Sequence, residues 1–193
     1  MCDLGISPDN FNPKVFYVIK RRFNEESKIS YHSHDFVSLI YILSGACTYR
    51  INDELYSVKK GDIIICNPNI FHGKIMKSGE TISEFHTGFT DICIKNLPKN
   101  HLIASNACPV VSLSKYDQDF FKCCNEILLE QEKNDPGCDL LLKSMIMKLI
   151  IILLKETYYI ENIEEHSGFN FETYDKTNIV NTIISFMNDN YMK

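Results

Sequence analysis

Short runs of β-branched and aromatic residues, each ended by a turn signal, fill the sequence from Tyr31 to Leu113. The turn signals are Ser44-Gly45, Asn52-Asp53, Lys60-Gly61, Asn67-Pro68-Asn69, Ser78-Gly79 and Leu97-Pro98-Lys99. This spacing predicts a barrel or sandwich of short antiparallel strands. Residues 52–55 suit a tight hairpin between Ile51 and Val58, because Asn and Asp tolerate the left-handed backbone that such a turn requires.

After Leu113 the hydrophobic period changes to that of helices. Ser114, followed three residues later by Asp117, resembles a capping box and predicts a helix that ends near residues 134–137. Asp139 can cap a second helix that runs to about Tyr158. This second helix is apolar on most of its circumference, as expected of a helix that packs on its own domain and also on a partner. We therefore predict that helices in residues 114–160 form a homodimer.

Composition and charge exclude several classes of protein. The first ten residues contain Asp3 and Asp9 and no apolar run, so we predict no signal peptide and a cytoplasmic protein whose eight cysteines stay reduced. Lys143 and Lys148 interrupt the most apolar stretch, so no membrane span is expected. The formal charge is -5, with 20 basic and 25 acidic side chains. These residues therefore lack the basic excess expected of a DNA-binding domain.

The acidic excess lies at the end of the chain. From Glu156 to Lys193 there are two lysines and seven acids, so the remainder carries 18 charges of each sign. An acidic segment, residues 161–176, precedes a last amphipathic stretch from Ile179 to Tyr191. This arrangement predicts a linker followed by the start of another helical element.

Residues suited to binding a small molecule lie in two segments. The first segment runs from His32 to Ile42. Residues two apart in a strand share a face, so its alternate side chains, beginning with His32, point to one face of the strand. His72 follows a strand and an Asn-Pro turn, where it can meet them across a barrel interior. An apolar barrel with a few converging polar groups is the usual form of a ligand site. The candidate ligand-binding residues are His32, His34, Phe36, Ser38, Ile40, Ile42 and His72.

The same imidazoles are candidate metal ligands. His32, His34 and His72 can hold a divalent ion with an open water position. A carboxylate is missing beside them, which disfavours iron and manganese. A metal-free polar pocket, or histidines that only begin a strand, are the alternatives. Glu84 and His86 share a strand face and could supply a ligand, but a surface position is the expectation for both.

Two further segments have a structural and a functional interpretation. The run from Lys20 to Arg22 could bind DNA phosphates or an anionic ligand, but a solvated strand end is expected because Glu25 and Glu26 offset its charge. The polar segment from Met1 to Pro13 would suit an arm that orders on ligand binding, although a frayed terminus is the default.

The motifs carry a resemblance to the cupin superfamily. Its first motif, His-x-His with a later Glu and Gly, is matched by His32, His34 and Gly45, and Ser38 stands in place of the Glu. Its second motif is matched by Gly61, Asp62, Pro68 and His72. Within the cupins, residues 32–73 are most similar to the N-terminal sensor domain of AraC-type transcription regulators. The resemblance implies a mainly β fold with C-terminal helices, namely a double-stranded β-helix barrel followed by a two-helix dimerisation unit.

The resemblance also implies a domain plan and a function. Residues 1–113 would form the ligand-sensing barrel with its N-terminal arm, residues 114–160 the helical dimerisation unit, and residues 161–193 a linker and the start of a helix-turn-helix domain beyond Lys193. The implied function is non-enzymatic: a small-molecule effector in the barrel controls transcription, and DNA is bound only by the part beyond Lys193. The alternative is a metal-dependent cupin enzyme, a dioxygenase or isomerase, with His32, His34 and His72 as ligands.

Overall fold

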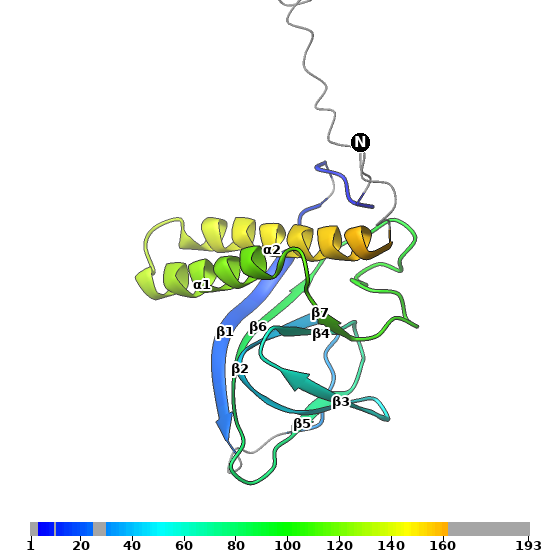
Figure 1. The fold of residues 1–193 in the computed structure, drawn as a ribbon. Helices are drawn as coiled ribbons and strands as arrows, with labels where there is room; N and C mark the ends of the chain where they lie inside the picture. Colours follow the sequence, from blue (N-terminus) through cyan, green and yellow to red (C-terminus); the bar gives the residue numbers. More distant parts are fainter. Residues whose placement is uncertain (1–3, 10, 25–29, 162–193) are drawn as a thin grey trace, which may run out of the picture. The chain divides into compact units, whose positions relative to one another are not determined.

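The computed structural model describes residues 4–9, 11–24 and 30–161. The linker and the last amphipathic stretch expected from the sequence lie outside these residues. Seven strands precede two helices (Figure 1): β1 (Lys14–Asn24), β2 (Val37–Ile51), β3 (Glu54–Lys59), β4 (Asp62–Cys66), β5 (His72–Ile75), β6 (Thr81–Thr90), β7 (Val110–Ser112), α1 (Asp117–Lys133) and α2 (Cys138–Glu161). The predicted order, antiparallel strands and then two helices, is confirmed.

The long strand β2 belongs to both halves of the barrel. Its first part pairs with β4 and β6, its last part pairs with β3 and β5, and every pairing is antiparallel. Between these parts the register shifts after Ile42, and Gly45 has a φ of 84°. A Cβ at Gly45 would lie 2.0 Å from the carbonyl oxygen of Thr81, so glycine is needed at this corner. The shift and the glycine let one strand serve both halves.

The predicted hairpin is confirmed. Ile51 of β2 pairs with Glu54 of β3 across the two-residue turn Asn52-Asp53. Asn52 has a φ of 50°, the left-handed conformation that Asn tolerates better than most residues.

The two faces of the sheet bury two separate apolar clusters. Side chains alternate along β2, so Ile40 and Ile42 point into the barrel while Leu39 and Tyr41 point outward to the helices. Tyr41 contacts Phe120 of α1, with ring centroids 5.2 Å apart. The interior cluster consists of Ile40, Ile42, Cys47, Tyr49, Ile51, Val58, Ile64, Cys66 and Ile82.

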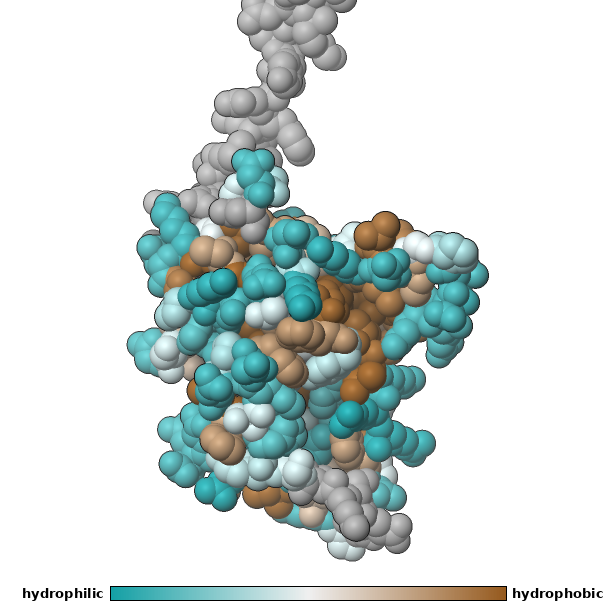
Figure 2. All heavy atoms as spheres, turned by 180° about the vertical axis from the view of Figure 1, so that it is seen from behind, coloured by the Kyte–Doolittle hydropathy of each residue, from teal (hydrophilic) through white to brown (hydrophobic). Residues whose placement is uncertain are grey.

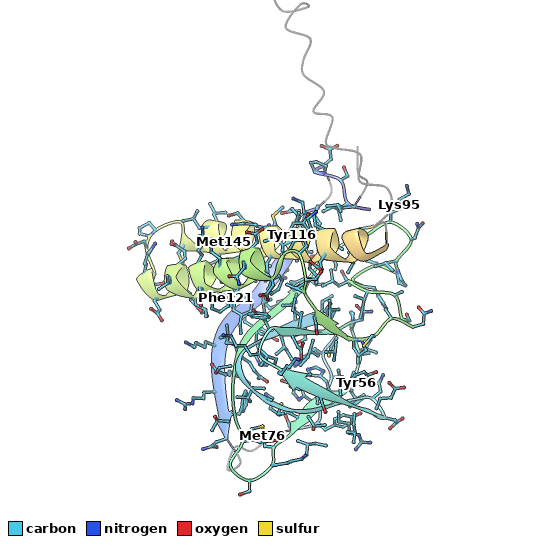
Figure 3. The ribbon with its side chains drawn as sticks, viewed as in Figure 1. Tyr56, Met76, Lys95, Tyr116, Phe121 and Met145 are labelled. Carbon is cyan, nitrogen blue, oxygen red and sulfur yellow. The ribbon has the colours of Figure 1, made fainter. Side chains whose placement is uncertain are left out.

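The helices close the outer face of the sheet. Figure 1 shows α1 and α2 side by side against the barrel, and Tyr116, Phe121 and Met145 pack against the shared core (Figure 3). Strands and helices form one compact unit from Leu4 to Glu161. Neither helix in the described part of the chain is long and apolar enough to cross a membrane.

The start of α1 differs from the sequence prediction. The capping box is wrong: the residue before α1 is Tyr116, no side chain of its own segment caps the helix, and the Ser114 hydroxyl donates to Glu156 instead. A buried carboxylate from α2 thus replaces the local cap. The end of α1 is as predicted, because Asn134 closes it in the left-handed conformation.

Candidate functional site

A cavity of about 540 Å³ opens in the barrel. Strand β1 supplies one wall through alternate residues, from Tyr17 to Phe23, because residues two apart share a face of a strand. The other walls come from β2, β5, β6 and the segment before β2. The lining residues are Tyr17, Ile19, Arg21, Phe23, Ser30, His32, His34, Ser38, Ile40, Tyr49, His72, Gly73, Lys74 and His86.

Three imidazoles meet at one part of this cavity. His32 and His72 form an isolated antiparallel bridge, in which each backbone N–H donates to the other's carbonyl, at 3.1 and 2.8 Å. The ring centroids of His32 and His34 are 4.7 Å apart, and that of His72 lies 4.8 Å from His32 and 5.4 Å from His34. One ring nitrogen from each residue lies within 4.8 Å of the others. The two motifs are therefore joined by backbone pairing as well as by side-chain contact.

Hydrogen bonds set the orientation of two of these rings. Nδ1 of His32 donates to the carbonyl of Ser30 at 2.9 Å, and Nδ1 of His72 donates to that of Ile70 at 3.0 Å. A carbonyl only accepts, so both Nδ1 atoms carry hydrogen, and Nε2 is the ring nitrogen that keeps the lone pair in the neutral form. Burial lowers the pKa of His72 to about 4, and burial also lowers the pKa of His34. The rings of His72 and His34 are therefore neutral at neutral pH.

This donor set fits a divalent metal. Metal-binding histidines usually donate their second ring N–H to a carbonyl or carboxylate, as His32 and His72 do here. Imidazole suits zinc, copper, nickel and iron. Ser38 lies at the position of the missing carboxylate and is buried, so the side chains at the motif positions supply three nitrogens and no anionic ligand.

Of the remaining sequence candidates, two line the cavity and two do not. Ser38 and Ile40 line the cavity with the three imidazoles. Phe36 does not line it: its ring stacks on His34 at 4.6 Å and packs beside Gly88, where a Cβ would lie 2.6 Å from it. Ile42 is wholly buried in the interior cluster, just before the register shift at which β2 turns the corner.

A second polar cluster lies in the barrel, around Glu84. This carboxylate is fully buried, so the expected surface position is wrong. Its Oε1 accepts from the Tyr49 hydroxyl at 2.7 Å, and its Oε2 accepts from Lys74 Nζ and His86 Nε2, both at 2.7 Å. The reason is topological: β6 lies between β1 and β2, and the face that carries Glu84 is the inside of the barrel.

The charges in this cluster stabilise one another. Burial alone would raise the pKa of Glu84, but hydrogen bonds from His86 and Lys74 and the positive charge of Lys74 hold it below its usual value. Burial lowers the pKa of Lys74, and Glu84 opposes that effect. Lys74 Nζ also lies 3.3 Å from the ring centroid of Phe23, a cation–π contact. The cluster is a buried ion pair with every carboxylate oxygen engaged.

The family assignment rests on the whole barrel and most of the helices. A family model described as an AraC-like ligand binding domain matches residues 13–150. The chain belongs to this family. Its AraC-like domain has the cupin-like fold that the motifs predicted, an antiparallel barrel followed by two helices. A search of curated proteins found no match.

Solved structures similar to the AraC-like domain cover less of it. A cupin-like protein from Thermotoga maritima is 22% identical over 40% of this chain and 57% of its own, with a TM-score of 0.35. A Photorhabdus luminescens protein is 27% identical over 42% and 63%, with a TM-score of 0.34. An RmlC-like cupin from Shewanella frigidimarina is 14% identical over 40% and 73%, with a TM-score of 0.35. The chain thus spans less than two thirds of the first two.

The AraC-like domain has cavity residues that sequence reasoning missed. Tyr49, Lys74 and His86 reach the cavity from β2, β5 and β6, and Arg21, which is exposed as expected of a solvated strand end, also lines it. Alternation along β1 was the available signal for Arg21. In contrast, no residue of 4–9 or 11–13 lines the cavity; Phe11 of the predicted arm is buried in the core beneath the helices.

Proposed function

We propose that the cavity binds a small-molecule effector and that the AraC-like domain is the sensor of a transcription regulator. The observation that carries this proposal is the cavity itself, about 540 Å³ with apolar walls and converging polar groups, within a chain of the AraC-like ligand-binding family. Cavities of this size and lining are typical of small-molecule sites. On this proposal residues 1–113 sense the effector, and another part of the regulator binds DNA in the cytoplasm.

The structure offers a short physical route from the cavity to the helices. Val18 lies between the cavity residues Tyr17 and Ile19, and its carbonyl accepts a hydrogen bond from Gln131 of α1 at 2.7 Å. Tyr41 adjoins the cavity residue Ile40 and packs on Phe120. A ligand shifts an equilibrium only by its differential affinity for two states. A movement of β1 or β2 on ligand binding would therefore change the contacts that position α1 on the sheet.

We further propose that residues 114–160 form a homodimer. Leu129, Leu140 and Leu141 of the helices are exposed by 58%, 70% and 52%, and Figure 2 shows hydrophobic residues gathered at the helical part of the surface. Exposed apolar residues in one region favour an interface. Sedimentation at micromolar concentration tests this, and a monomer would refute it.

Ligand binding in the cavity can be tested with a variant in which a larger side chain fills the cavity. A compound that raises the Tm of the wild type should fail to do so in Ile19→Trp, because Ile19 lines the cavity. Lys20→Trp is the matched control, since Lys20 is exposed on the opposite face of β1. A broad panel of small molecules with no effect on the wild type, or equal binding by Ile19→Trp, would contradict the proposal.

The imidazole trio supports a second candidate function, a metal-dependent cupin enzyme. His32, His34 and His72 would hold the ion, which as a Lewis acid could activate water or polarise a bound substrate. Metal analysis of protein purified without added metal distinguishes the two functions. Stoichiometric iron, manganese or nickel that is lost in His72→Ala would favour the enzyme.

A further inference from the structure

One side of the cavity carries a positive charge that no described residue neutralises. Arg21 of β1 lies directly opposite Glu84 of β6, which lies opposite Ile42 of β2. Directly opposed residues of antiparallel strands point to the same face, so Arg21 is directed to the inside of the barrel, as Glu84 is. Arg21 lines the cavity, although the residue is exposed.

The charges of this layer do not balance. Lys74 and Arg21 carry two positive charges, and Glu84 carries one negative charge. Glu84 is already engaged by Lys74, His86 and Tyr49. Among the residues that the structure describes, Arg21 forms no ion pair, and the cavity lining contains no further carboxylate. Counted over the described residues, one net positive charge therefore faces the cavity.

The surroundings of Arg21 specify the rest of the ligand. Ile19 and Phe23 flank it on the same face of β1, and Ile40 of β2 also lines the cavity. A guanidinium presents a planar fork that suits a carboxylate, and the apolar walls suit a hydrocarbon or aromatic body. Because a single charge is uncompensated, a monoanion matches the cavity better than a doubly charged phosphate ester does.

We propose that the effector is a small organic monocarboxylate, bound through Arg21, with its apolar body against Ile19 and Ile40. This inference rests on the proposed function, because it assumes that the cavity is the effector site. The proposal makes Arg21 a specificity-determining residue that selects acids over neutral molecules of the same shape.

The test uses pairs of probes that differ in charge. Benzoate, 4-hydroxybenzoate and phenylacetate are each compared with their primary amides by calorimetry and thermal shift, with phenyl phosphate as the dianion. At least one acid should bind more tightly than its amide and than phenyl phosphate. Arg21→Gln should weaken that acid about 10- to 100-fold, the effect of removing a hydrogen bond to a charged group. Arg22→Gln, exposed on the opposite face of β1, should bind as the wild type does.

The outcomes separate this inference from the proposed function. Amides that bind as well as acids, tighter binding of phenyl phosphate, or equal binding of an acid by Arg21→Gln would overturn the monocarboxylate and leave a ligand-binding cavity. No binding by any probe would overturn the inference. The proposed function would then be tested separately, by the broad panel of small molecules and the Ile19→Trp variant. Weaker binding of the acid at high salt would support the monocarboxylate proposal, because salt screens the charge of the exposed Arg21.

Discussion

The carboxylate of Glu156 in α2 holds the start of α1, and its removal should destabilise the domain. Glu156 is fully buried and accepts hydrogen bonds from the backbone N–H groups of Ser114, Lys115 and Tyr116, at 2.8, 3.1 and 3.0 Å, and from the Ser114 hydroxyl. A negative charge here also interacts favourably with the helix dipole of α1. Glu156→Gln keeps one acceptor oxygen but places an N–H₂ donor against N–H donors.

The expected loss follows from the bonds that the amide cannot replace. Oε2 accepts from Lys115 and Tyr116, and hydrogen bonds to a charged group contribute about 1.5–3 kcal/mol each. Allowing for partial relaxation, Glu156→Gln should lower the free energy of unfolding by about 3 kcal/mol. Urea denaturation followed by circular dichroism at neutral pH measures it. Glu132→Gln, an exposed site in α1, is the matched control.

A double-mutant cycle and a pH series make the reasoning refutable. Ser114→Ala and Glu156→Gln should be coupled, because the two side chains share a hydrogen bond. Burial raises the pKa of Glu156, but its hydrogen bonds hold the pKa below the usual 4.5. Its contribution is therefore fully present above pH 4.5 and is lost as the pH falls through the lower folded-state value. Two results would refute the capping role. One is a decrease of less than about 1 kcal/mol in the free energy of unfolding of Glu156→Gln, and the other is a stability difference between the wild type and Glu156→Gln that stays the same in acid.

Three other predictions concern the barrel. Lys74→Met leaves the buried Glu84 carboxylate without its cation and should cost about 3–5 kcal/mol by urea denaturation; Lys74→Met with Glu84→Gln should recover part of it, and no recovery would contradict the pairing. Gly45→Ala should prevent folding or lower the Tm steeply, because its Cβ would clash with the Thr81 carbonyl. A Tm equal to that of the wild type would disprove the requirement for glycine at this corner of β2. His72 should titrate near pH 4 in NMR spectra, below its usual 6.5, and its neutral form should contribute stability that is lost as the pH falls from 6.5 toward 4; titration near 6.5 would show that the ring is not buried.

The fold was predictable where the signals were local. Asn52 marks the place where the backbone leaves β2, and Gly45 marks a corner within β2; both have a positive φ. The change of period after Leu113 marked two helices, and the structure has them. The cap of α1 was not predictable, because Glu156 is distant in sequence and competes with the local pair Ser114 and Asp117. Local propensity identified the helix, and a tertiary contact determined how it begins.

The cavity shows what a strand pattern can and cannot reveal about a binding site. His32 and His34 were predictable because they are neighbours on one face, and the Asn-Pro turn before His72 suggested the third imidazole. Glu84 and Lys74 were not, since each alone is typical of a surface strand and only their pairing makes burial tolerable. That pairing depends on β6 lying between β1 and β2, a property of the topology.

Register carries the missing information from one strand to the next. Ile19 lies opposite His86, and His86 lies opposite Ile40, so the inward face of β2 assigns the inward face of β6 and then that of β1. Arg21 lies two positions after Ile19 on β1 and is paired with Glu84, so its side chain must also face inward. A sequence motif on one strand therefore becomes informative about distant cavity residues once the pairing order is known, and the position of Arg21 in the cavity lining follows from that order.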